Sequence, residues 1–178
     1  GYEVVVTDID EEHLQRSAEL VDIFNSSLIE EGIMLPEEAE EVRGLISYST
    51  DNQVFSDADL IIEAIIEKME IKQDFWREIE AIARRDAFFA TNTSGLSING
   101  ICEKVENKGR FIGMHFWNPP HIIPLVELTK ADETSDETVE ELKKLMTIID
   151  KEAVVVHKDA PGFIGNRLQF AVFREALH

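Results

Sequence analysis

Short apolar runs alternate with longer segments of helical periodicity along the whole chain. In the longer segments, apolar side chains recur every three or four residues, as on one face of an α-helix. The strand-length runs comprise residues 4–6, 45–48, 60–66, 87–90, 110–116 and 153–156, and the helical segments residues 10–28, 37–42, 69–84, 97–104, 135–150 and 161–178. This alternation predicts an α/β fold in which a mostly parallel sheet is covered by helices on both faces.

Three of the predicted helices have features that define an end or a face. Asp10 can cap the helix that follows it, and Pro36 suits the first turn of the next one. In segment 69–84, we expect an apolar face on one side of the helix, and its members are Ile71, Phe75, Ile79 and Ile82.

The most informative stretch comprises residues 111–128 and reads FIGMHFWNPPHIIPLVEL. A strand that contains His115 breaks at Pro119 and Pro120, and a second apolar run that contains Glu127 follows. A kinked chain can fold the two runs side by side and bring the imidazole into contact with the carboxylate. Such a pair is a common arrangement for a general base. The alternative is a buried histidine that is satisfied by any acceptor.

Polar residues follow several of the predicted strands, namely Asp8, Glu67, residues 92–94 and His115. Ligands of open α/β sheets bind outside the carboxyl ends of the strands, so we expect these residues to gather at one edge. Asp8 is placed to accept hydrogen bonds from an adenosine ribose, which favours NAD over NADP, although it could instead be a helix-capping acid. Taken alone, residues 92–95 are typical of a capped turn.

Two asparagines are further candidates for residues of the functional site. Asn118 follows His115 closely and could polarise a carbonyl group, and Asn166 near the start of the last helix is another donor. A surface or interdomain hydrogen bond is the alternative role of Asn166.

Composition narrows the classes of partner. The 178 residues suffice for one domain of ordinary size, and the net charge of −19 argues against nucleic acid and anionic membrane surfaces as partners. The single cysteine, Cys102, cannot form an internal disulfide, so we expect an inert thiol and a reducing, cytoplasmic location. No segment has the pattern of a signal peptide or of a membrane span, and we expect no bound metal.

Several strings, in this order and spacing, resemble the L-3-hydroxyacyl-CoA dehydrogenase family: DLIIEAIIEKMEIKQDFW, NTSGLSI, GMHFWNPP, IPLVEL and PGFIGNRL. The resemblance extends over nearly the whole chain. It implies a Rossmann-like, doubly wound NAD-binding domain over residues 1–158 that lacks its first strand and glycine-rich turn. Residues 159–178 would open a helical dimerisation domain.

The resemblance also implies roles for individual residues. His115 matches the general base that removes the 3-hydroxyl proton, and Glu127 matches the carboxylate that orients it. Ser94, Asn118 and Asn166 match residues of the catalytic site, and the positions that match the NAD site are Asp8, Glu67, Lys72, Asn92, Ser94 and Asn118. The implied enzyme interconverts L-3-hydroxyacyl-CoA and 3-ketoacyl-CoA in fatty-acid β-oxidation and forms a homodimer. We expect the chain as given to be inactive.

The sequence departs from this pattern in one respect. Acidic residues 10–12 and 30–31 lie where the mitochondrial members of the family carry lysines near the CoA phosphates. Parts of the chain also look similar to the lambda-crystallin branch, which includes gulonate 3-dehydrogenase, so a free hydroxy acid is the alternative substrate. A dehydrogenase-like binding or structural protein is a third hypothesis, and the presence of both His115 and Glu127 argues against it.

Overall fold

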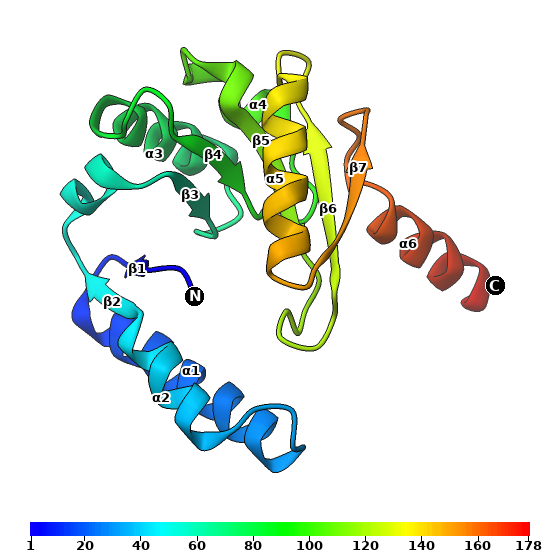
Figure 1. Cartoon of the computed structure of the whole chain (residues 1–178). Helices are drawn as coiled ribbons and strands as arrows, with labels where there is room; N and C mark the ends of the chain where they lie inside the picture. Colours follow the sequence, from blue (N-terminus) through cyan, green and yellow to red (C-terminus); the bar gives the residue numbers. More distant parts are fainter. The chain divides into compact units, whose positions relative to one another are not determined.

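A computed structural model describes all 178 residues. The chain divides into two compact units, residues 1–54 and residues 55–178 (Figure 1). The predicted boundary near residue 158 concerns a different division of the chain, and it stays a prediction. None of the helices combines the length and the apolar character that crossing a bilayer requires.

The first unit contains two parallel strands and two helices. Strand β1 (Val4–Thr7) pairs with β2 (Ile46–Ser49), and between them lie α1 (Glu11–Glu30) and α2 (Pro36–Gly44). Asp10 caps α1, because its carboxylate accepts a hydrogen bond of 2.9 Å from the backbone N–H of His13. Pro36 occupies the first turn of α2, as the sequence predicts.

The second unit is built on a five-stranded sheet in the order β3-β4-β5-β6-β7. The strands are β3 (Leu60–Glu63), β4 (Phe88–Thr91), β5 (Phe111–Phe116), β6 (Leu125–Lys130) and β7 (Glu152–Val156). All neighbours are parallel except β5 and β6, which form an antiparallel pair. The predicted class, an α/β fold with a mostly parallel sheet, is confirmed.

Four α-helices and three short 3₁₀ segments complete the second unit. The helices are α3 (Met69–Ile82), α4 (Ile98–Ile101), α5 (Asp136–Ile148) and α6 (Gly165–Ala176), and the 3₁₀ segments are η1 (Asn52–Asp57), which straddles the division, η2 (Cys102–Lys104) and η3 (Lys108–Arg110). Ser97 and Ser135 cap α4 and α5 through their side-chain oxygens.

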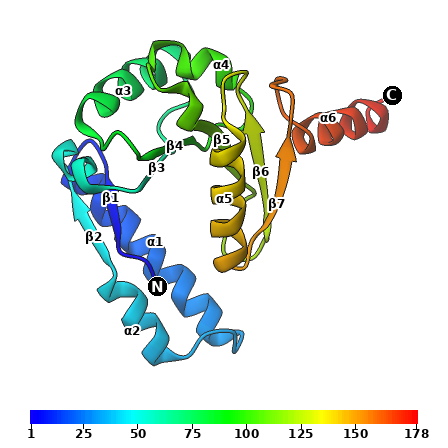
Figure 2. The same cartoon turned by 45° about the horizontal axis from the view of Figure 1, so that its top comes forward.

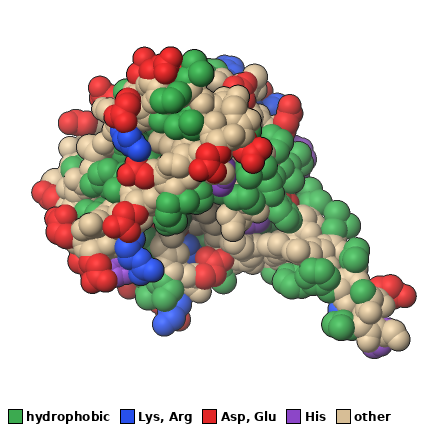
Figure 3. Space-filling model, turned by 90° about the horizontal axis from the view of Figure 1, so that it is seen from below, with side chains coloured by type: hydrophobic (Ala, Val, Ile, Leu, Met, Phe, Trp, Pro, Cys, Tyr) green, Lys and Arg blue, Asp and Glu red, His purple; other side chains and the backbone are tan.

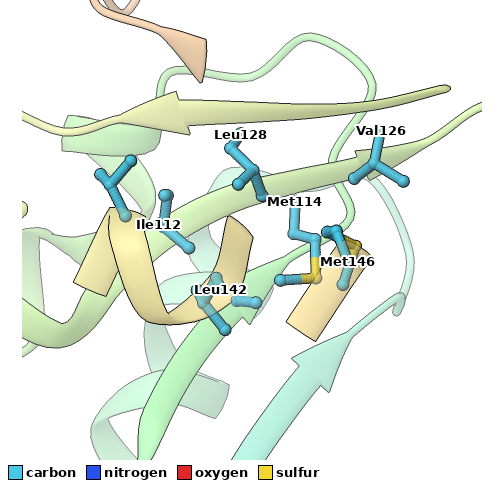
Figure 4. Packing of buried hydrophobic residues seen from close by; sticks show 8 residues of the cluster. Ile112, Met114, Val126, Leu128, Leu142 and Met146 are labelled. Carbon is cyan, nitrogen blue, oxygen red and sulfur yellow. The ribbon is translucent and has the colours of Figure 1, made fainter. Parts of the chain in front are cut away.

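Helix α5 covers one face of β5 and β6 (Figures 1 and 2). Because side chains alternate between the two faces of a strand, Ile112 and Met114 of β5 point towards this helix. They pack with the buried side chains of β6 and of α5 (Figure 4), which include Val126, Leu128, Leu142 and Met146.

The opposite face of β5 carries Phe111, Gly113 and His115, and the three residues have different surroundings. Phe111 contacts the ring of Trp76 from α3, with the ring centroids 5.0 Å apart. Gly113 lies against Ile98 of α4, where the absence of a side chain allows the close approach. His115 lies near the carboxyl end of the strand. The strand thus runs from the packed core to the edge at which ligands bind in such sheets.

Some predicted details differ from the structure. The strand predicted over 60–66 ends at Glu63, the apolar run 122–128 forms a strand only from Leu125, and the helix predicted from Pro161 begins at Gly165. The expected buried face of α3 is also partly wrong. Ile71 is exposed, and the buried residues are Lys72, Gln73, Trp76 and Ile79. The buried face includes Lys72 because its ammonium pairs with the buried carboxylate of Glu63.

Replacing Gly113 by alanine should destabilise the fold by about 1–3 kcal/mol, as overpacking does. The new Cβ would lie 2.6 Å from Cδ1 of Ile98 and 3.2 Å from Cβ of Thr129, and both residues are fully buried. Chemical unfolding would measure the change. The matched control is Gly109→Ala, where the nearest atom would be 3.8 Å away. Equal stability of the two variants would contradict the prediction.

Candidate active site

His115 and Glu127 face each other across the antiparallel pair of β5 and β6. The imidazole Nδ1 lies 2.9 Å from Oε2 of the carboxylate, and the two residues are 7% and 2% exposed. The chain reverses direction at the two prolines, and the register of β5 and β6 then places His115 directly opposite Glu127. The predicted pairing of imidazole and carboxylate is therefore present.

The Glu127 carboxylate has donors on both of its oxygens. Oε2 also lies 3.2 Å from Nε1 of Trp117, and Oε1 accepts the backbone N–H groups of Ile164 and Gly165 at 3.0 and 2.9 Å. Burial raises the pKa of Glu127, but hydrogen bonds from His115, Gly165, Ile164 and Trp117 outweigh it and lower the pKa below its ordinary value. The group is therefore an ionised acceptor at neutral pH.

The charge of Glu127 determines the tautomer of His115. A carboxylate can only accept, so Nδ1 of the neutral imidazole carries the proton and donates it to Oε2. The other nitrogen, Nε2, then has a free lone pair. A nitrogen with a free lone pair can accept a hydrogen bond, and then the proton, from a hydroxyl group.

The segment that leads into α6 is held to this site by several contacts. Asn166 donates through Nδ2 to the backbone carbonyl of Ser94 at 2.8 Å, and the N–H of Gly162 donates to the carbonyl of Gly95 at 3.4 Å. Asp159 accepts hydrogen bonds from the Ser97 hydroxyl and from the backbone and side-chain nitrogens of Asn99. Segment 159–166 is thereby joined to the loop after β4 and to the start of α4.

The loop after β4 also supports the end of β5. The side-chain oxygen of Asn92 accepts a hydrogen bond of 2.9 Å from the backbone N–H of Phe116, next to His115. Ser94 is exposed, and its hydroxyl makes no hydrogen bond within the protein. Asn118 is exposed as well, and its side chain has no partner. The structure therefore joins Ser94 and Asn166 directly but does not join Asn118 to His115.

Lys72 lies in the interior, between two carboxylates. Its ammonium is 2.5 Å from Glu63 and 3.3 Å from Glu67. Glu67 in turn accepts hydrogen bonds from the Thr93 hydroxyl at 2.5 Å and the Ser94 backbone N–H at 3.1 Å. Partial burial raises the pKa of Glu67, but the contacts with Thr93, Lys72 and the Ser94 backbone outweigh it. The pKa of Glu67 is therefore lowered overall. Lys72 therefore supports the Ser94 loop through Glu67, and its contact with a cofactor stays a prediction.

Glu63 is a residue of this network that the sequence analysis missed. It is 2% exposed at the end of β3, and its second oxygen accepts a hydrogen bond of 2.8 Å from the Thr91 hydroxyl. The signal was an acidic residue inside an otherwise apolar strand. A buried charge needs a partner, and a lysine nine residues away on the following helix could have been proposed.

Asp8 directly follows β1 in the other unit, where its carboxylate accepts a hydrogen bond of 2.7 Å from the backbone N–H of Ile9. Asp10 is the cap of α1, so Asp8 is not needed for that role. Its predicted part in binding the adenosine ribose stays a prediction.

The edge at the ends of β4 and β5 fits a ligand with several polar groups. The free hydroxyl of Ser94 and the free amide of Asn118 follow adjacent parallel strands, where open α/β sheets bind dinucleotides. No group of three or more His, Cys, Asp or Glu side chains is arranged to hold a metal ion. Cys102 is buried away from this edge in η2, and burial raises its pKa to about 11, so the thiol is unreactive at neutral pH.

Glu127→Gln should lower the free energy of unfolding by roughly 1–3 kcal/mol at about pH 7, because an amide cannot accept all of these donors. The folded-state pKa of Glu127 lies below its ordinary 4.5. The stability that the carboxylate contributes is therefore present above pH 4.5 and is lost as the pH falls further. Urea unfolding at several pH values would show the two proteins converging in acid.

The matched control for this measurement is Glu141→Gln on the exposed surface of α5, where the side chain pairs only with Lys144. It should change stability by less than about 0.5 kcal/mol. A Glu127→Gln deficit that is as large at about pH 3.5 as at about pH 7 would contradict the role of the ionised carboxylate.

Comparisons with known proteins identify the family of this chain. The family described as "3-hydroxyacyl-CoA dehydrogenase, NAD binding domain" matches residues 1–160. The chain is 34% identical over 178 residues to a 5-formyl-3-hydroxy-2-methylpyridine 4-carboxylate 5-dehydrogenase of Mesorhizobium japonicum, and 34% identical over 177 residues to a probable 3-hydroxybutyryl-CoA dehydrogenase of Deinococcus radiodurans. Each alignment covers 99% of this chain, but the chain spans only 57% and 63% of the lengths of these relatives.

A solved structure shows the same fold. The chain superposes on the crystal structure of 3-hydroxybutyryl-CoA dehydrogenase from Escherichia coli K12 with a TM-score of 0.94 and 32% identity, over 99% of this chain and 37% of that one. With the family match over most of its length, the chain belongs to the 3-hydroxyacyl-CoA dehydrogenase family and carries its NAD-binding domain.

Proposed function

We propose that the protein carrying this chain is an NAD-dependent dehydrogenase that interconverts L-3-hydroxyacyl-CoA and 3-ketoacyl-CoA. The proposal depends on one observation above all, the buried contact of 2.9 Å between Nδ1 of His115 and the ionised carboxylate of Glu127. NAD, when bound, accepts the hydride from the carbon that bears the hydroxyl group.

His115 is the general base in this proposal. The Nε2 atom takes the proton of the 3-hydroxyl group, and the ring becomes an imidazolium whose Nδ1–H remains on Glu127. The negative charge of Glu127 stabilises that imidazolium in a site where burial strengthens the attraction. In the reverse direction, the imidazolium returns the proton to the oxygen of the 3-keto group.

Ser94, Asn118 and Asn166 orient the reactants in this proposal. The exposed Ser94 hydroxyl and the Asn118 amide are free to bind the substrate oxygen or the cofactor. Asn166 fixes the backbone of Ser94. Glu67 and Asn92 support the same loop, and Asp8 binds the adenosine ribose. The names of the Deinococcus relative and of the Escherichia coli structure support this substrate class.

His115→Gln in the full-length protein should reduce kcat by roughly 10²–10⁴-fold, the usual effect of losing a general base. The affinity for NAD should change little, because the ring acts on the substrate hydroxyl. Steady-state assays with 3-hydroxybutyryl-CoA and NAD, together with a direct NAD titration, would measure both. His157→Gln is the matched control, since His157 follows β7 and is exposed. Turnover close to the unmodified level would remove His115 from the mechanism.

A free hydroxy acid is the second candidate substrate. Its support is the Mesorhizobium relative, whose name describes a pyridine carboxylate rather than a CoA ester. The charge of the first unit points the same way. Residues 1–54 contain fourteen acidic side chains, two arginines and no lysine, a composition that disfavours the phosphate groups of CoA.

A substrate panel would separate the two candidates. The proposed function predicts that acetoacetyl-CoA oxidises NADH with a kcat/KM at least about 100-fold above that of acetoacetate, because binding energy from the CoA portion contributes to the transition state. Gulonate, tested with NAD in the opposite direction, completes the panel. NADH absorbance follows each reaction. Preference for a free acid would favour the second candidate.

We also propose a role in fatty-acid β-oxidation, a homodimer and a cytoplasmic location. The apolar side chains along α6 support assembly, since none of its residues is buried and Leu168, Phe170 and Phe173 are more than half exposed. Hydrophobic side chains are visible on the projection at the lower right of Figure 3. The lone free cysteine is in keeping with a reducing compartment.

A further inference from the structure

Phe163 adopts a backbone conformation that bulky residues avoid. Its φ is +48°, in the left-handed region, and it directly follows Gly162 with a φ of +78°. The other non-glycine residue of this kind, Asp150 with a φ of 56°, has a short polar side chain and lies in the turn before β7, where such conformations are common. The conformation of Phe163 is sterically unfavourable, so other contacts must maintain it.

The backbone turn at Phe163 directs two donors towards Glu127. Ile164 returns to right-handed values, with φ −91° and ψ −55°. A left-handed residue followed by a right-handed one makes successive N–H groups converge on one point, which is a common way of binding an anionic oxygen. Here the converging N–H groups of Ile164 and Gly165 both bond to Oε1 of Glu127.

The side chain of Phe163 packs against the other member of the pair. The residue is only 2% exposed, and the centroid of its ring lies 6.0 Å from that of the His115 ring, with the ring planes at an angle of 55°. Trp117 contacts the same imidazole, with a centroid separation of 5.6 Å. Trp117 is also held close to the backbone at Gly165, where an added Cβ would lie only 2.0 Å from its ring. Two aromatic rings thus limit the access of water to the imidazole.

From these contacts we propose that Phe163 is a positioning residue for His115. Its backbone gathers the N–H donors that hold Oε1 of Glu127, while its ring covers the imidazole that donates to Oε2. The Nδ1–H of His115 therefore stays on Glu127 and exchanges slowly with water, and Nε2 remains the basic atom. The effect on turnover rests on the proposed general-base function, whereas the effect on the hydrogen bond does not.

Two variants separate the effect of the aromatic ring from the effect of the backbone conformation. Phe163→Gly removes the ring, while glycine adopts a φ of +48° without steric strain. Phe163→Leu keeps apolar bulk but loses the aromatic contact. The matched control is Phe88→Leu, at the amino end of β4 and partly buried, where the ring contacts Arg110 instead. Circular dichroism and thermal unfolding would establish that each variant is folded.

The first measurement is proton and nitrogen magnetic resonance of the full-length protein labelled with ¹⁵N-histidine. The unmodified protein should show a protected Nδ1–H signal, assigned to His115 by its absence from His115→Gln, and a nitrogen shift typical of the Nδ1–H tautomer. Phe163→Gly and Phe163→Leu should lose the protected signal and show mixed tautomers, whereas Phe88→Leu should retain both features. A protected signal that persists in both folded Phe163 variants would overturn the proposal.

The second measurement is steady-state kinetics of the same proteins. We expect each Phe163 variant to lower kcat roughly 10-fold, a fraction of the 10²–10⁴-fold effect of losing the base, with little change in the KM for NAD. An equal fall in kcat for Phe88→Leu would overturn the proposal, because the effect would then not be specific to Phe163. If His115→Gln retains turnover while the Phe163 variants lose the protected signal, the general-base function fails and the positioning of His115 stands.

Discussion

An ionised carboxylate that is 2% exposed is the constraint on which the site depends. Burying such a charge is unfavourable unless hydrogen bonds replace the water that it loses. Glu127 obtains its donors from three places: the ring of His115 on β5, the indole of Trp117 just after it, and two backbone N–H groups at the start of α6. The group that orients the imidazole therefore also fixes where the last helix begins.

A second buried charge supports the neighbouring loop by the same principle. Lys72 lies between Glu63 in the interior and Glu67 near the surface, and Glu67 holds the backbone of Ser94. Two sets of contacts thus converge on the Ser94 loop. One comes from β3 and α3 through Lys72, and the other comes from segment 159–166 through Asn166. The loop between them leaves the Ser94 hydroxyl exposed for a ligand.

Charge outside the site bears on what can bind. Acidic side chains are spread over the face seen in Figure 3, where basic ones are few, in keeping with the net charge of −19. The acids at the start of α1 have a structural explanation, because negative charge at a helix N-terminus is favourable. Such a surface attracts no polyanion, so affinity for an acyl-CoA would have to come from local contacts rather than from the overall field.

By itself, the sequence determined the class of fold and the pairing of His115 with Glu127. Alternating strand-length and helical patterns define an α/β sheet, and the two prolines between apolar runs predict a reversal of the chain, since both signals are local. Tertiary structure decided the rest. In the sequence, Glu63 only interrupts an apolar run, whereas in the structure it pairs with Lys72. That pair places Lys72 on the buried face of α3. The donors from Ile164 and Gly165 could not be predicted, because they are backbone groups 37 and 38 residues from Glu127, and no side-chain pattern encodes where a distant backbone N–H will lie.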